Sequence, residues 1–266
     1  MISRLPGLSL PERAWGVVRR WALAWWRILY LGAVVCVLVL SPSSYGKVTR
    51  RALARHLYLD TAPVLLGFTV LAALISLVLT RIVVGTAISY GLSRYALEMV
   101  IRVLVLELIP LTAALFVAMR CTIPNGTQLA LLRQSGHLAR LSHAGADPIR
   151  VELLPRAVAG VFACITLAAL SCVVALVLAY LGVYGFSLAG LPSYTRMFGH
   201  VFAPAVTLVF VIKTVLFSLA VALIPMAAGL YDTGERTQPD SELGGLARMF
   251  AVLLLIEIGS LVGNYY

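Results

Sequence analysis

Charge is scarce in this 266-residue chain. Only 12% of its residues are charged, against about 25% in soluble domains. Lysine is nearly missing, since Lys47 and Lys213 are the only two, and there are 11 acidic residues. Hydrophobic residues make up 61% of the chain, and the mean hydropathy is +0.97. So little charge excludes an ordinary water-soluble domain and predicts a membrane protein.

Several chemical signatures are also missing from the sequence. Neither lysine stands in a phosphate-binding glycine-rich loop, so we expect any ATP hydrolysis to take place on another chain. The four histidines form no H-E-x-x-H pair, and the four cysteines have no metal-type spacing. No basic patch is interleaved with stacking aromatics, which argues against nucleic-acid binding. We therefore expect no catalytic residues, no metal and no cofactor.

Long apolar runs dominate what is present. Each is near or above the roughly 20 residues that cross a hydrocarbon core. A spanning segment without water must satisfy its own backbone, so each run is predicted to be a helix. None shows the period-two alternation of a barrel strand. We predict an all-α polytopic protein with about five transmembrane helices, near 62–84, 99–119, 157–184, 201–230 and 243–264.

The N-terminal region has a different pattern. Its apolar run, 28–40, has about 13 residues, which is too few to span alone. Upstream, Arg13, Arg20 and Arg27 recur every seven residues opposite a tryptophan-rich face. This pattern is typical of a helix lying in the headgroup plane, so we predict an interfacial elbow helix. A cleaved signal peptide is the competing interpretation, but the polar leader is too long and too aromatic for one.

Basic residues predict the orientation. We divide the chain into an N-terminal region, 1–60, and a transmembrane domain, 61–266. Residues 1–60 hold nine basic and two acidic side chains, and the polar break 120–156 holds five and two. Because two spans separate these regions, both can lie in the cytoplasm, as the positive-inside rule favours. The N-terminus is then cytoplasmic and the C-terminus external.

The polar segment 121–156 is longer and more regularly patterned than a simple loop would need to be. We expect a turn at Pro124–Thr127, with Thr127 as the N-cap of a short amphipathic helix to about His143. Asp147 is then expected to cap the next helix, with Pro148 in its first turn. A solvated loop is one interpretation, and a helix presented to a cytosolic partner is the other. Such a docking helix would present Arg133, His137 and Arg140 on one face.

Three stretches of the sequence resemble one protein family. They are ELIPLTAALFVAMR at 107–120, ADPIRVELLPRAVAG at 146–160 and IKTVLFSLAVALIPMAAGLYD at 212–232. Their order and spacing over about 50–266 are similar to those of the MlaE (YrbE-type) permease family. The chain departs from the family pattern at Ile109, where a glycine is usual. In the coupling helix, Gln128 and Gly136-His137 replace acidic and E-Q positions, which predicts a basic docking face.

The resemblance implies a function. Such permeases are the membrane subunits of ABC transporters that move phospholipid or related lipids between the inner and outer membranes of bacteria. Two copies usually pair with two cytosolic ATPase subunits, a periplasmic ring of MCE-domain proteins and often a small STAS-domain protein. We therefore expect a multi-pass inner-membrane protein with a periplasmic C-terminus and no enzymatic activity. The alternative is a non-transporting scaffold that recruits a cytosolic partner through its basic loop.

The resemblance and the spans together indicate candidate site residues. Ionisable side chains inside a span are candidate functional groups. Glu107 and Lys213 either face a lipid cavity or form a structural ion pair, and Glu257 either packs in the bundle or pairs with Lys213. We assign Arg133, His137, Arg140 and Asp147 to ATPase coupling, Arg120 and Arg156 to anchoring at the membrane interface, and Gly259 and Gly263 to helix packing.

Overall fold

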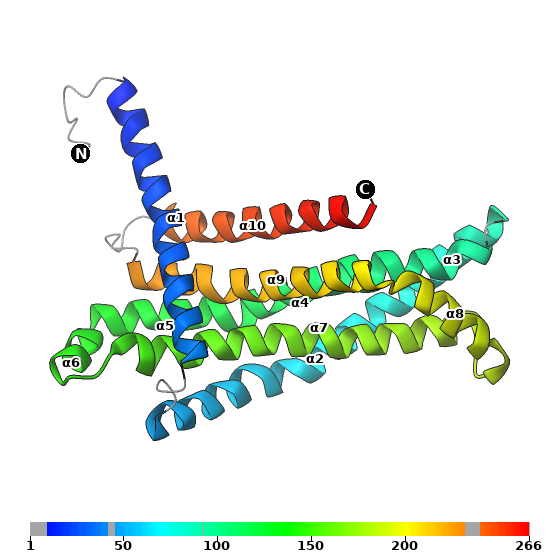
Figure 1. Cartoon of the computed structure of the whole chain (residues 1–266), viewed down its shortest axis with the longest axis horizontal. Helices are drawn as coiled ribbons and strands as arrows, with labels where there is room; N and C mark the ends of the chain where they lie inside the picture. The colour runs from blue at the N-terminus through cyan, green and yellow to red at the C-terminus, as the bar shows by residue number, and fades with distance from the viewer. Residues whose placement is uncertain (1–9, 42–45, 92, 232–239, 266) are drawn as a thin grey trace.

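Helices form all the regular structure that the computed structural model describes, which comprises residues 10–41, 46–91, 93–231 and 240–265. Five long helical stretches run back and forth along one axis (Figure 1). They are α2 (Lys47–Ser89), the stretch from α3 (Ser93–Val100) to α5 (Ile123–Gln134), α7 (Leu154–Tyr184), α9 (Pro204–Tyr231) and α10 (Asp240–Tyr265). This arrangement confirms the predicted all-α polytopic fold. The single helix α2 runs through the boundary that we drew at residue 60.

The two ends of the bundle carry different short elements. At one end, here named the α6 end, lie α6 (His137–His143), the start of α2 and the start of α7 (Figure 1). At the other, the α8 end, lie α3, a 3₁₀ turn (Leu188–Gly190) and α8 (Leu191–Val201). The polar segment and the basic start of α2 are therefore at the same end, as the charge pattern predicts.

The N-terminal helix α1 (Leu10–Leu40) crosses the others near the α6 end instead of running along them (Figure 1). Its inner face, with Leu31 and Val35, packs against α9 and the start of α7. Residues Trp21–Leu40 are long and apolar enough to span a membrane, so six described helices meet that criterion, against the five we predicted. The prediction counted only 28–40, whereas a continuous helix adds the tryptophan-rich turns before it.

Three π-helical segments interrupt the regular helices, and each ends two residues before a proline. They are η2 (Ile101–Leu108) before Pro110, η3 (Ala118–Thr122) before Pro124, and η4 (Ile149–Leu153) before Pro155. A proline ring inside an α-helix clashes with the carbonyl four residues earlier and lacks an N–H to pair with it. A wider π turn moves that carbonyl away, so the helix continues through the proline.

The predicted turn at Pro124–Thr127 is wrong for this reason. The helix continues through η3 into α5, and the hydroxyl of Thr127 donates to the carbonyl of Ile123 within the helix instead of capping its start. The predicted span 99–119 is thus part of one candidate span, Tyr95–Gln134. The first part of the segment that we assigned to the cytosol, residues 121–134, therefore continues a candidate membrane helix.

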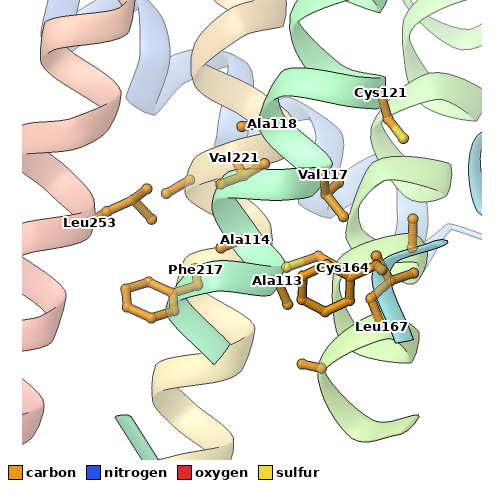
Figure 2. Close-up of a cluster of buried hydrophobic side chains, with 14 of the residues drawn as sticks. Ala113, Ala114, Val117, Ala118, Cys121, Cys164, Leu167, Phe217, Val221 and Leu253 are labelled. Atoms are coloured by element: carbon orange, nitrogen blue, oxygen red, sulfur yellow. The ribbon is translucent and has the colours of Figure 1, made fainter. Parts of the chain in front are cut away.

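Small side chains let the central helices approach closely. Ala113 and Ala114 of α4 (Ile109–Val117) are fully buried against α7 and α9, with Phe217 of α9 and Leu253 of α10 beside them (Figure 2). Alanine costs no side-chain entropy on burial, and small residues are typical of helix contacts in membranes. This core fixes α4, α9 and α10 relative to one another, which positions the polar groups described next.

Candidate functional site

An intramembrane charge cluster lies where α9, η2 and α10 meet. Lys213 of α9 is at its centre, and only 1% of its side chain is exposed. Its ammonium forms an ion pair with Glu107 of η2 and lies 2.9 Å from an oxygen of Glu257 on α10. Of the alternatives that the sequence left open, Glu107 and Lys213 form the ion pair, and Glu257 pairs with the same lysine. A buried charge of this kind needs partners to offset its lost hydration.

The proline of the E-L-I-P sequence explains one of the lysine's contacts. Pro110 has no N–H, so it cannot donate to the carbonyl of Leu106, four residues earlier. The Lys213 ammonium donates to this carbonyl at 3.3 Å. Within this stretch, the same local sequence thus supplies both a carboxylate and a backbone acceptor for one buried cation.

Further polar groups extend the cluster along α10. The Asn264 amide donates to Glu107 at 3.3 Å, two turns beyond Glu257. Ser260 lies between them, and its hydroxyl is buried without a hydrogen-bond partner. Glu257, Ser260 and Asn264 follow the spacing i, i+3, i+7, so they share one face of the helix. Sequence analysis left Glu257 open, and its only signal there was a carboxylate inside an apolar span.

The predicted coupling residues do not form one helical face. Gly136 adopts a left-handed conformation with φ of 70°, which ends α5 and lets α6 start in a new direction. Arg133 turns inward and donates to the Leu230 carbonyl of α9 at 2.7 Å. Arg140 is exposed and also reaches back to the Ser135 carbonyl at 2.9 Å. We predicted one helix that Gly136 only weakens, whereas α5 ends before Gly136 and a separate helix, α6, begins after it.

His137 and Asp147 have local partners. His137 lies 3.7 Å from the carboxylate of Glu152. The carboxylate of Asp147 accepts the backbone N–H of Ile149 at 3.0 Å, so it caps the helix that follows, as predicted. Arg150 lies 3.6 Å from the same carboxylate. Because both groups are about half exposed, this pair contributes little to stability.

The two arginines that we assigned to the membrane interface differ in environment. Arg120 is exposed, whereas only 8% of the Arg156 side chain is exposed. Arg156 donates to both the carbonyl and the carboxylate of Glu152, at 2.6 and 2.5 Å. It therefore fixes the first turns of α7 from inside, which differs from a side chain reaching up to the headgroups.

A second polar network joins α2 to α5 near the α6 end. Asn125 donates to the carboxylate of Asp60 at 3.0 Å, and the thiol of Cys121 donates to the Asp60 carbonyl at 3.1 Å. His56 lies 3.9 Å from the same carboxylate, one turn away on α2. These contacts tie α2 to η3 and the start of α5.

The crossing of α5 over α9 is unusually close. A Cβ atom at Gly126 would lie 2.6 Å from the backbone oxygen of Pro225, and one at Gly229 would collide with the backbone oxygen of Gly126. Only glycine fits at two facing positions of such a contact. With Arg133 bonded to the carbonyl of Leu230 in the next turn, α5 and α9 form a stiff junction.

An apolar groove runs along the outer side of α4. It has a volume of about 230 Å³ and lies between α2 and α4. Leu108, the last residue of η2, also lines it. Thr112 contributes its only hydroxyl, and that hydroxyl donates to the Leu108 carbonyl. The groove is lined by Phe68, Leu71, Ala72, Ile75, Leu108, Ile109, Thr112, Leu115, Phe116 and Met119. Such a surface suits a hydrocarbon chain and offers nothing to a polar solute.

Comparison with known proteins decides the family. The family model described as Permease MlaE matches residues 53–261. The chain belongs to the MlaE permease family. A search of the curated proteins finds no match. The matched MlaE region includes the charge cluster residues Glu107, Lys213 and Glu257, and also the whole coupling segment 121–156.

The predicted glycine contact lies at the edge of the MlaE match. Gly259 is inside it and Gly263 is outside. In this permease a Cβ at Gly263 would lie 3.7 Å from Val209 of α9, whereas one at Gly259 would meet nothing within 4 Å. Only Gly263 therefore faces α9 closely, and the face at Gly259 is open within the chain.

Proposed function

We propose that this permease is the membrane subunit of an ABC transporter that moves phospholipid or a related lipid between the inner and outer membranes. It resides in the bacterial inner membrane with its N-terminus in the cytoplasm and its C-terminus in the periplasm. A separate cytosolic ATPase hydrolyses the ATP. The family match over residues 53–261 carries this proposal.

The apolar groove supports lipid as the substrate. A hydrocarbon chain buries its surface against Phe68, Leu71 and Phe116 with no polar group left unpaired. The groove opens outward from α2 and α4, so a second copy of the permease facing it would enclose a larger apolar cavity. A periplasmic ring of MCE-domain subunits then receives the lipid at the α8 end, and a STAS-domain protein binds on the cytosolic side.

The stiff junction between α5 and α9 supports mechanical coupling. An ATPase that grips α6 and its flanking turns pushes directly on α5. Because Gly126 and Gly229 bring the two backbones into contact, α5 cannot shift without moving α9. Helix α9 carries Lys213 about four turns away, so the push changes the width of the cavity beside the charge cluster. No covalent chemistry is required of this chain.

Among the predicted coupling residues, Arg140 is the best placed to meet a partner. Its side chain is exposed on α6, and Arg133 is committed to α9 instead. The acidic positions usual in the family are replaced here, so the docking face is basic and fits an acidic groove on the ATPase. A partner that recognises positive charge should be repelled by a reversed charge at this position.

The experiment is co-purification of the permease with a co-expressed nucleotide-binding subunit of an ABC transporter. Arg140→Glu should reduce its recovery at least tenfold, because like charges then meet in the docking groove. Arg196→Glu on α8, an exposed arginine at the opposite end, is the matched control and should leave recovery unchanged. Equal recovery of the ATPase by wild type and Arg140→Glu would sink the docking assignment. A scaffold would retain its cytosolic partner but carry no bound lipid.

A further inference from the structure

The cluster of Glu107, Lys213 and Glu257 has unbalanced charge if each group is ionised. Two carboxylates then face one ammonium. The Lys213 side chain is 1% exposed, and those of Glu107 and Glu257 are 13% and 15% exposed. A net charge at such a position within a membrane costs more than any neutral arrangement of the same atoms. The site therefore requires one further positive charge.

No second cation among the described residues supplies that charge. Arg102, one turn before the cluster in η2, is paired with Glu98 at 3.0 Å. On α7, the thiol of Cys172 donates to the Val105 carbonyl at 3.6 Å and is not a cation. On α10, Arg248 lies more than two turns before Glu257 and donates to the Gly244 carbonyl. Lys213 is the single basic residue of α9.

The cluster also contains buried oxygens that accept no hydrogen bond. An ammonium has three N–H groups. Two of those of Lys213 serve the Leu106 carbonyl and Glu107, and the ammonium also forms an ion pair with Glu257 Oε2 at 2.9 Å. That oxygen is buried and accepts no hydrogen bond, and neither does Oδ1 of Asn264. A proton on a carboxyl group would neutralise the excess charge and add one donor among these acceptors.

Both carboxyl groups form ion pairs with the same nitrogen, so they share one site. Two carboxylates that share a site do not both ionise readily, and the proton then belongs to the pair. We propose that Glu107 and Glu257 share one proton at neutral pH, which makes the cluster a neutral proton-binding site inside the membrane. This inference does not depend on the identity of the transported lipid.

The polar face of α10 provides a path for that proton. Ser260 and Asn264 continue from Glu257 towards the α8 end, and each has a buried oxygen without a hydrogen-bond partner. Loss of the proton leaves a net negative charge between α10 and η2. Because α10 is held to α9 beside this cluster, deprotonation weakens the attachment of the last helix.

The test is infrared spectroscopy of the purified full-length permease in lipid-free detergent at neutral pH. A protonated carboxyl group gives a carbonyl band that shifts on hydrogen–deuterium exchange. We expect such a band in the wild type and its loss in both Glu107→Gln and Glu257→Gln, because either change leaves one carboxylate balanced by Lys213. The control is Glu98→Gln, which removes the carboxylate of the Arg102–Glu98 pair. The Glu98 side chain is 28% exposed, and this variant should retain the band.

Spectra of the wild type that match those of both glutamine variants would overturn the proposal. Thermal unfolding provides a second measurement that does not depend on band assignment. The melting temperature of the wild type should fall as the pH is raised from 7 to 9, roughly in proportion to the proton lost, and Glu257→Gln should abolish most of that fall. Parallel curves for wild type and Glu257→Gln would also overturn it.

Discussion

Replacing Gly126 with alanine tests the junction between α5 and α9 directly. The new Cβ would lie 2.6 Å from the Pro225 carbonyl oxygen, whereas ordinary contact begins at 3.4 Å. The two helices must therefore move apart by about 0.8 Å, and both obstacles are backbone atoms that cannot rotate away. Overpacking of this kind costs about 1–3 kcal/mol. At about 2–4 °C per kcal/mol, the melting temperature should fall by several degrees.

The assay is thermal unfolding of the purified protein, followed by ATPase activity of the assembled transporter. Gly67→Ala in α2 is the matched control, because a Cβ there meets nothing within 4 Å. It should leave the melting temperature unchanged or raise it, since alanine favours helix. We expect Gly126→Ala to lower both stability and lipid-stimulated ATP hydrolysis. Identical melting curves for the two variants would refute the reasoning that the backbones touch.

Three other predictions concern separate parts of the molecule. Lys213→Met leaves two buried carboxyl groups without their cation and should cost about 3–5 kcal/mol, against at most about 1 kcal/mol for Glu98→Gln, as compared by thermal unfolding. Thr112→Trp fills the apolar groove and should reduce co-purified lipid by more than half, measured by mass spectrometry, whereas Leu254→Trp on an exposed face should not. Burial raises the pKa of the Tyr194 hydroxyl in α8 from 10.0 to about 12. The neutral tyrosine therefore contributes stability that is present below pH 10 and is lost as the pH rises towards 12. Tyr194→Phe should remove this part of the alkaline destabilisation, as measured by melting curves over a series of pH values.

The fold class could be predicted because hydrocarbon imposes one solution on a long apolar run. Runs such as 157–184 and 201–230 agree with α7 and α9 to within a few residues. The cost of a charge in hydrocarbon also indicated Glu107 and Lys213, since an ionisable group inside a span is rare unless it has a partner or a function. Their contact with Glu257 depends on how α10 is placed against α9, and no local pattern contains that information.

The errors lie where backbone geometry overrides residue preference. Pro124 predicts a helix boundary, but the π turn of η3 lets the helix pass through it. Gly136 predicts a weak point and is a complete break, because its left-handed conformation is inaccessible to a continuing helix. As a result, Arg133 donates to α9 while Arg140 is exposed on α6, although their spacing suggests a common face.

The π turns also determine how the helix from α3 to α5 addresses its neighbours. Each extra residue in a π turn rotates all later side chains by about 100° relative to a regular helix. The polar groups of this long helical rod, from α3 to α5, therefore face different neighbours along its length. Glu107 in η2 contacts α10, whereas Asn125, after η3, contacts α2. Deleting one residue from η3 would preserve a helix but turn Asn125 and Gly126 away from their partners. The length of this rod is thus as much a part of its specificity as its sequence.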